Sequence, residues 1–340
     1  MARGRLPRFA VAGLVCVLGA GAAGCTEGGS TSPGEAMSDE ARSYLSTALT
    51  VMEQNALRSG DVDWADVRRT AYTEAGNAQR PADTYPAIKR ALSSLGDSHS
   101  GFYDPKGAQE LSGDDQVRQP VEGRALDGRL GYLSLPGVQG SEKIYKQYVR
   151  EGRDAVAKAD RPNACGWVID LRRNRGGNMW PMLAVVGPIL GDGDVGSFID
   201  ADGKKTVWSV EDGSPRLDGE STGWGASPPA GEGSAPVAVL TSRSTASSGE
   251  AVAVAFRGRA DTRSFGEATT GVPTGNKSHR LSDGAILNLT EVMDADRTGR
   301  AYDSPIPPDE EVVDNLGRGG SRDPVLDAAT EWLAEQSSCA

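Results

Sequence analysis

The sequence has few of the side chains from which metal sites are built, with two histidines and four cysteines among its 340 residues. No cluster of cysteine and histidine has the short spacing of a zinc site, so we expect no bound metal. A glycine-rich phosphate-binding motif is also missing, and we expect neither a nucleotide nor another cofactor. The formal net charge is −11, whereas a nucleic-acid-binding surface needs positive charge, so nucleic acid is not an expected partner.

The chain also lacks an apolar run long enough for a good transmembrane helix. Residues 1–24 instead have the pattern of an export signal: three arginines, a short apolar stretch and small residues before Cys25. This pattern resembles a bacterial lipoprotein signal, in which Cys25 carries the lipid that anchors the protein to the outer face of the cell membrane. The alternative is an ordinary secretory signal cut near Ala23. Residues 25–37 are rich in Gly, Ser, Thr and Pro and predict a flexible linker.

Two cysteines remain in the body of the chain, Cys165 and Cys339. An oxidising exterior would allow them to form a disulfide. Spacing in the sequence does not fix their separation in space, so a disulfide and two unrelated thiols both remain open.

Residues 38–95 have the apolar periodicity of amphipathic helices, with Ser38 and Asp63 at positions typical of N-caps. They predict a small helical bundle at the N-terminal end. The remainder, residues 96–335, alternates short apolar strand patterns with helical ones and predicts an α/β core in which helices flank a central sheet. Within this core, residues 201–235 are polar and rich in Gly and Pro, and we expect a flap over the site.

The most informative segment is a buried strand that runs through a sharp turn into a helix of small residues. The turn has the sequence Thr-Ala-Ser-Ser-Gly-Glu over residues 245–250 and presents Ser247. A serine in this position has an exposed hydroxyl with backbone N–H groups beside it, as an acyl-transfer nucleophile requires. The alternative is a serine that only caps the helix. A base is also needed, and His99, in Asp-Ser-His-Ser, is a stronger candidate than His279 in a polar strand.

Other motifs accompany the serine turn in a fixed order. Asp-Leu-Arg-Arg-Asn-Arg-Gly-Gly (170–177) follows a buried strand, Gly-Glu-Ala-Thr-Thr-Gly occupies 266–271, and Ile-Pro-Pro-Asp occupies 306–309. Together with the serine turn they resemble the C-terminal (tail-specific) processing protease family of serine peptidases. The resemblance extends from about residue 96 to about residue 315.

The resemblance can be narrowed to one branch of that family. Many members use a lysine base directly after the Gly-Glu-x-Thr-x-Gly loop, but here Val272 occupies that place and Lys277 is displaced. The segment around His99 is similar to the branch that includes the nisin resistance proteins and the tricorn core protease, where a histidine replaces the lysine. Residues 176–182 are also close to the nisin resistance pattern, and we recognise no PDZ-like segment. The resemblance implies a ClpP/crotonase-like protease core.

The branch implies roles for individual residues. Ser247 is expected to attack a peptide carbonyl, while His99 accepts the hydroxyl proton and returns it to the leaving amine. The N–H of Ser248, with that of Gly176 or Gly177, is expected to bind the oxyanion.

Further residues are expected to support this machinery. Ser98 is a candidate for holding the tautomer of His99, and Asp303 is a candidate acidic partner for the same ring. Asp170 and Arg172 are expected to fix the end of their strand, and Glu250 to support the serine turn.

The function that follows is endoproteolysis of peptides or unstructured protein outside the cell. The branch suggests trimming of an antimicrobial peptide such as a lantibiotic, although a general cell-envelope protease fits the residues equally well. A proteolytically inactive lipoprotein that binds a ligand or peptide is the alternative from another class, since fold does not fix function.

Overall fold

The structure, a computed structural model, describes residues 36–112, 119–160, 164–225, 234–315 and 322–339. The expected signal, Cys25 and the linker up to residue 35 lie outside the described residues. None of the helices in the described ranges has the length and apolar character needed to cross a membrane.

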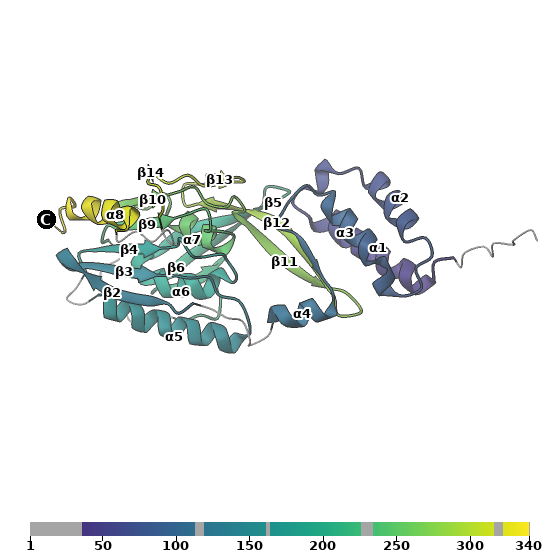
Figure 1. Cartoon of the computed structure of the whole chain (residues 1–340), viewed down its shortest axis with the longest axis horizontal. Helices are drawn as coiled ribbons and strands as arrows, with labels where there is room; N and C mark the ends of the chain where they lie inside the picture. The colour runs from purple at the N-terminus through teal and green to yellow at the C-terminus, as the bar shows by residue number, and fades with distance from the viewer. Residues whose placement is uncertain (1–35, 113–118, 161–163, 226–233, 316–321, 340) are drawn as a thin grey trace, which may run out of the picture. The chain divides into compact units, whose positions relative to one another are not determined.

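The expected helical bundle is present (Figure 1) and consists of α1 (Asp39–Asn55), α2 (Trp64–Glu74) and α3 (Tyr85–Ser93). Two short 3-10 helices, Ser59–Asp61 and Pro81–Thr84, lie in its connections. Ser38 and Asp63 cap α1 and α2 as predicted, each accepting a backbone N–H at 3.1 Å.

The bundle shares one hydrophobic cluster with a long β-hairpin formed by β11 (Thr274–Arg280) and β12 (Ile286–Asp296). Leu287 and Leu289 of β12 pack among its helices. At the hairpin tip, Asp283 accepts hydrogen bonds from the hydroxyls of Tyr44 and Tyr85. Polar and apolar contacts therefore both fix the bundle to the hairpin.

The central sheet has the strand order β14-β10-β9-β4-β3-β2, in which all neighbours are parallel except the β2–β3 pair. Its inner strands β4 and β9 are apolar and buried at every position, as expected for strands covered on both faces. The strand bounds are β2 Glu122–Leu126, β3 Leu130–Ser134, β4 Gly166–Asp170, β9 Val237–Thr241, β10 Thr262–Gly266 and β14 Glu310–Glu311.

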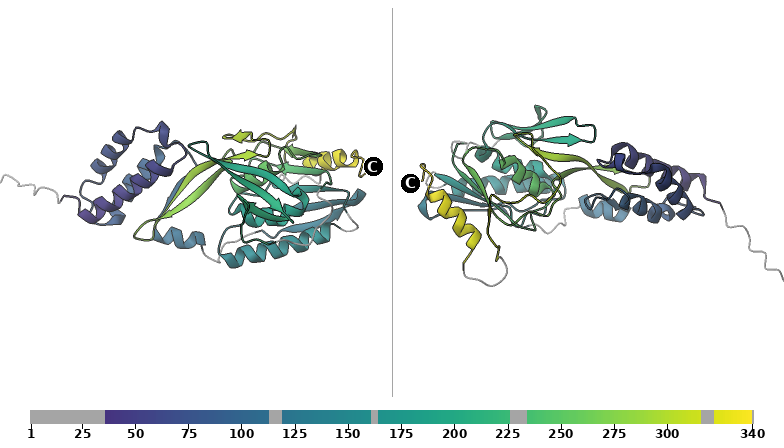
Figure 2. Two further views of the ribbon diagram at one scale, coloured as in Figure 1. Left: turned by 180° about the vertical axis from the view of Figure 1, so that it is seen from behind. Right: turned by 90° about the horizontal axis from the view of Figure 1, so that it is seen from above.

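Helices cover both faces of this sheet, which confirms the predicted α/β class (Figure 2). On one face lies α8 (Pro324–Ala334), and on the other lie α5 (Glu142–Ala159), α6 (Met179–Leu190) and α7 (Ser248–Phe256). The loops that follow the parallel strands β4, β9 and β10 leave the sheet at the same edge. In open α/β sheets this edge carries the functional loops.

A second sheet packs against α6 and α7 in the order β1-β12-β5-β6-β7-β8, with β11 and β13 also paired to β12. The described part of the expected flap, residues 201–225, contains the antiparallel strands β6 to β8. The remaining bounds are β1 Gly101–Tyr103, β5 Gly193–Asp200, β6 Lys205–Glu211, β7 Ser214–Leu217, β8 Glu220–Ser221, β13 Ala301–Tyr302, α4 Pro105–Ser112 and a 3-10 helix at Asp127–Arg129.

Cys165 and Cys339 form a disulfide, with their Cα atoms 5.1 Å apart. The sequence left open whether these two cysteines pair. They do so because the segment after α8 returns to the beginning of β4. The bond closes a loop with a sequence separation of 174 residues.

Candidate active site

Ser247 lies between β9 and α7 with φ 52° and ψ −122°, a backbone conformation that is rare for any residue except glycine. Such a conformation costs on the order of 1–3 kcal/mol and persists only where surrounding contacts determine it. Those contacts are present. Thr245 donates its hydroxyl to Leu171 O at 2.9 Å, and the N–H of Ala246 donates to Asn174 O at 3.0 Å. The turn is therefore held against the loop that follows β4.

The Gly-Gly loop approaches Ser247 so closely that no side chain would fit. A Cβ atom on Gly176 would lie 2.8 Å from Cβ of Ser247, and Gly176 has φ +95°. Its N–H donates to Oδ1 of Asn174 at 3.0 Å and is therefore already engaged within the loop. Ser248 donates its hydroxyl to Gly177 O at 2.6 Å, which joins the two loops directly. In the described chain the N–H groups of Gly177 and Ser248 have no acceptor.

Asp170 and Arg172 fix the end of β4, as predicted. Arg172 is 3% exposed and donates Nε and Nη2 to the two carboxylate oxygens of Asp170 at 3.0 and 2.6 Å. It also donates to both carboxylate oxygens of Asp323 at 2.8 Å. Hydrogen bonds within the fold therefore occupy the Arg172 guanidinium.

Glu250 supports the serine turn, as predicted, and reaches further than the sequence indicated. Its carboxylate is fully buried and accepts four hydrogen bonds. One oxygen accepts from the Thr269 hydroxyl and the Gly271 N–H, and the other accepts from the N–H groups of Ser247 and Val272. Burial raises the pKa of Glu250, and these four hydrogen bonds oppose the rise. One side chain thus connects the serine turn to the loop after β10.

His99 lies after the helical bundle, half-buried, in a segment that Asp97 organises by accepting the N–H groups of His99 and Ser100 at 3.0 and 2.6 Å. Its Nδ1 lies 2.7 Å from the hydroxyl oxygen of Thr274. If Nδ1–H donates to that oxygen, Nε2 carries the lone pair that a base requires. Burial lowers the pKa of His99 below its ordinary value, and the charge of Asp97 partly opposes this.

The candidates expected to orient His99 lie near it without contacting its ring. Ser98 and Asp303 are both exposed and line the same cavity of about 420 Å³ as His99. Within the described residues neither forms a hydrogen bond with the imidazole. Thr274 occupies that role, although sequence reasoning did not select it.

Ser247 and His99 are not hydrogen-bonded to each other in the described chain. Catalytic hydrogen bonds are often long in unliganded enzymes and tighten when substrate binds. The alternative bases are engaged elsewhere: Nε2 of His279 contacts Glu291, and Nζ of Lys277 lies 3.9 Å from the same carboxylate.

The loops around Ser247 therefore form a strained strand-to-helix turn beside which, in the described chain, two backbone amides have no acceptor, a geometry that suits acyl transfer. The family model described as Peptidase family S41 matches residues 129–312, which is more than half of the chain. The chain belongs to peptidase family S41 and is a serine-type peptidase.

Three relatives show how far the similarity extends. The nisin-resistance protein of Lactococcus lactis subsp. lactis is 26% identical over 294 residues, which cover 86% of this chain and 87% of that protein. The structure of a lipoprotein from Streptococcus agalactiae is similar with a TM-score of 0.68 and 23% identity, over 87% of this chain and 96% of that chain. The photosystem II D1 C-terminal processing protease has a TM-score of 0.59 at 18% identity, over 81% and 94% of the two chains. Both solved structures share the fold.

Proposed function

We propose that this protein is an endopeptidase of the cell surface in which Ser247 is the nucleophile and His99 the general base. The observation that carries the proposal is the strained turn of Ser247, fixed against Gly176 with the N–H groups of Gly177 and Ser248 free beside it.

Ser247 Oγ attacks the carbonyl carbon of a peptide bond while His99 Nε2 accepts the hydroxyl proton. The oxygen of the tetrahedral intermediate receives hydrogen bonds from the N–H groups of Gly177 and Ser248. The C–N bond then breaks, the imidazolium gives its proton to the leaving amine, and water hydrolyses the acyl-enzyme by the same route in reverse. Of the two glycines left open by the sequence, Gly177 is preferred because the N–H of Gly176 already donates to Asn174.

The serine and the histidine are linked through one loop. Glu250 binds the N–H groups of Ser247 and Val272, and Thr274, two residues further along, binds His99. A substrate that presses on this loop would therefore move both reacting side chains together. We infer that the Ser247–His99 hydrogen bond forms when substrate is bound.

The relatives and the N-terminal pattern support a proposal for the substrate and the location. Similarity to a nisin-resistance protein supports an antimicrobial peptide of the lantibiotic type as substrate. The export pattern over residues 1–24, together with similarity to a streptococcal lipoprotein, supports anchoring through lipid on Cys25. The described residues 201–225 would then act as a cap over a peptide held at the cell surface.

The experiment is cleavage of a mixed peptide library by the wild type, Ser247→Ala and His99→Ala. Loss of nearly all cleavage in both variants is the expected result. Substantial activity in His99→Ala alone would mean that another residue is the general base. A folded wild type that cuts nothing would favour the second candidate, a peptide-binding lipoprotein. The absence of a Ser247–His99 hydrogen bond in the described chain is also consistent with that candidate.

A further inference from the structure

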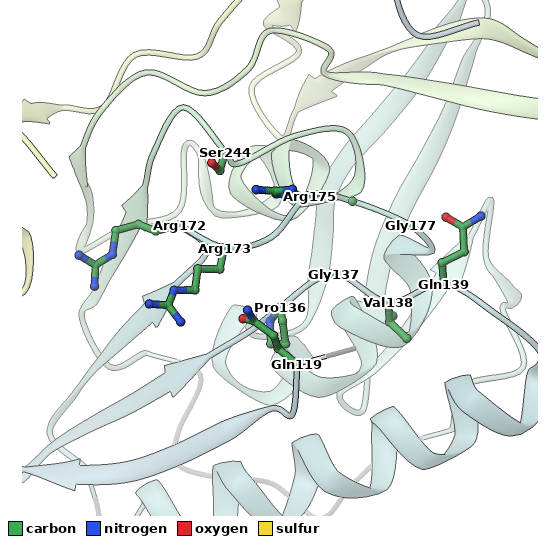
Figure 3. A pocket seen from close by; sticks show the side chains of 11 residues that line it. Gln119, Pro136, Gly137, Val138, Gln139, Arg172, Arg173, Arg175, Gly177 and Ser244 are labelled. Atoms are coloured by element: carbon green, nitrogen blue, oxygen red, sulfur yellow. The ribbon is translucent and has the colours of Figure 1, made fainter. Parts of the chain in front are cut away.

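A second cleft opens beside the Gly-Gly loop and has a volume of about 590 Å³. Gly176 and Gly177 form part of its wall, and Arg173 and Arg175 project from the segment just before them (Figure 3). We propose that this cleft is a substrate subsite in which Arg173 and Arg175 bind a carboxylate of the peptide. The inference rests on the proposed peptidase function and adds a specificity to it.

The two arginines differ from their neighbour Arg172 in being free. Arg172 is buried and engaged with Asp170 and Asp323. Arg173 and Arg175 are exposed, and neither has an ion pair or side-chain hydrogen bond with any residue of the described ranges. The chain carries 47 acidic against 36 basic residues, so counter-ions are abundant. Two exposed guanidiniums of one cleft, without a partner among the described residues, are therefore available for an external anion.

The remaining lining of the cleft suits the same ligand. Among the described residues no Asp or Glu lines it, and Gln119 and Ser244 add neutral hydrogen-bond donors. Guanidinium groups bind carboxylates through paired N–H donors, which gives both affinity and orientation. By contrast, the cavity that contains His99 is lined by the carboxylates Asp97, Asp200 and Asp303 and by a single arginine. The two hollows flanking the proposed reaction centre thus carry opposite charge.

The location also limits where the carboxylate lies in the substrate. Arg175 directly precedes Gly176 and Gly177, and the latter is proposed to bind the carbonyl under attack. An extended peptide advances about 3.3 Å per residue, so the bound carboxylate lies within about two or three residues of the scissile bond. Its source is either an Asp or Glu side chain or the C-terminal carboxylate of a short substrate.

Binding is measured rather than cleavage, so that a failure here is distinct from a failure of the peptidase assignment. Fluorescein-labelled Ala/Gly octapeptides carry one Glu at each position in turn, with a Gln counterpart, and each is made with a free or an amidated C-terminus. They are titrated against the Ser247→Ala chain. We expect the carboxylate form to bind roughly tenfold more tightly at one position, which corresponds to about 1.4 kcal/mol.

The same titrations with Arg173→Gln and Arg175→Gln combined should reduce that difference to less than twofold. Arg150→Gln, which removes one exposed charge from α5, should leave the difference intact. Combined Arg173→Glu and Arg175→Glu should reverse the preference toward a Lys-containing peptide. A Glu-specific difference assigns a side-chain carboxylate, and a difference between free and amidated ends assigns the chain terminus. No preference in the Ser247→Ala chain with both arginines intact, or a preference that survives both double variants, overturns the proposal.

Discussion

Glu250→Gln tests whether one buried carboxylate assembles the site. The glutamate accepts two hydrogen bonds on each oxygen, and the amide of glutamine must place an NH2 group where one oxygen was. In the less harmful orientation, the NH2 group replaces the oxygen that contacts Thr269 and Gly271. The Thr269 hydroxyl can rotate to accept a hydrogen bond from this group, whereas the Gly271 N–H can only donate. Glutamine is therefore expected to leave one buried donor unpaired.

The magnitude follows from these bonds. An unpaired buried N–H costs about 1–3 kcal/mol, and each remaining bond weakens because it loses its charged acceptor. The burial that raises the pKa of Glu250 works in the other direction, since a neutral amide is cheaper to bury. We expect a net loss of at least about 2 kcal/mol, or a melting temperature lower by about 4 °C or more.

The assay is thermal unfolding of the purified variant beside the wild type, with the turnover number measured on the same samples. Glu267→Gln is the matched control, because among the described residues its carboxylate pairs only with the exposed Arg243, at 3.5 Å, so that its loss should shift the melting temperature by less than about 1 °C. If Glu250→Gln melts within the range of this control, the four hydrogen bonds do not hold the turn. Retained turnover in a destabilised variant would show that Glu250 stabilises the fold without positioning Ser247.

Three further predictions concern neighbouring groups. Ser248→Ala removes the hydroxyl that donates to Gly177 O and should lower the turnover number roughly tenfold with little change in KM, which steady-state kinetics will show. Burial lowers the pKa of His99, so the acid limb of the kcat/KM profile should have its midpoint below about 6.5, and a midpoint above that value would argue against His99 as the base. Asp294 is buried without a hydrogen-bond partner in the described chain, and burial together with the charge of Glu250 raises its pKa well above the ordinary value. The folded state therefore binds a proton that the unfolded state releases near pH 4, so stability should fall as pH rises from about 4 toward the folded pKa, and Asp294→Asn should remove that fall in chemical denaturation.

Local patterns in the sequence predicted most of the elements that build the site. The amphipathic periodicity of residues 141–159 predicts a helix, and the continuous apolar run from Gly166 predicts a buried strand; the structure has α5 and β4 at these positions. The sequence also predicts a helix over residues 182–190, but α6 begins earlier, at Met179, because the side chain of Asn178 caps it at 3.1 Å.

What the sequence left open depends on contacts between distant segments. His99 and Thr274 are 175 residues apart, and no periodicity links them. The choice between Gly176 and Gly177 required knowing where the side chain of Asn174 points. The apolar pattern of residues 285–290 predicts a strand that ends there, but β12 continues to Asp296. The buried polar residues Asp294 and Asp296 hide this part of the strand from any pattern based on hydrophobicity.

The disulfide between Cys165 and Cys339 determines which fragments stay covalently joined after proteolytic cleavage. A single cut anywhere between the two cysteines leaves both fragments covalently joined, and Ser247, Glu250 and the Gly-Gly loop all lie inside that closed segment. His99 lies outside it, together with the helical bundle. Under oxidising conditions, a molecule cut between the cysteines would therefore keep both fragments of the segment that contains Ser247. A cut between His99 and Cys165 would instead leave the fragment with His99, the proposed base, held only by noncovalent packing, and dilution could release it.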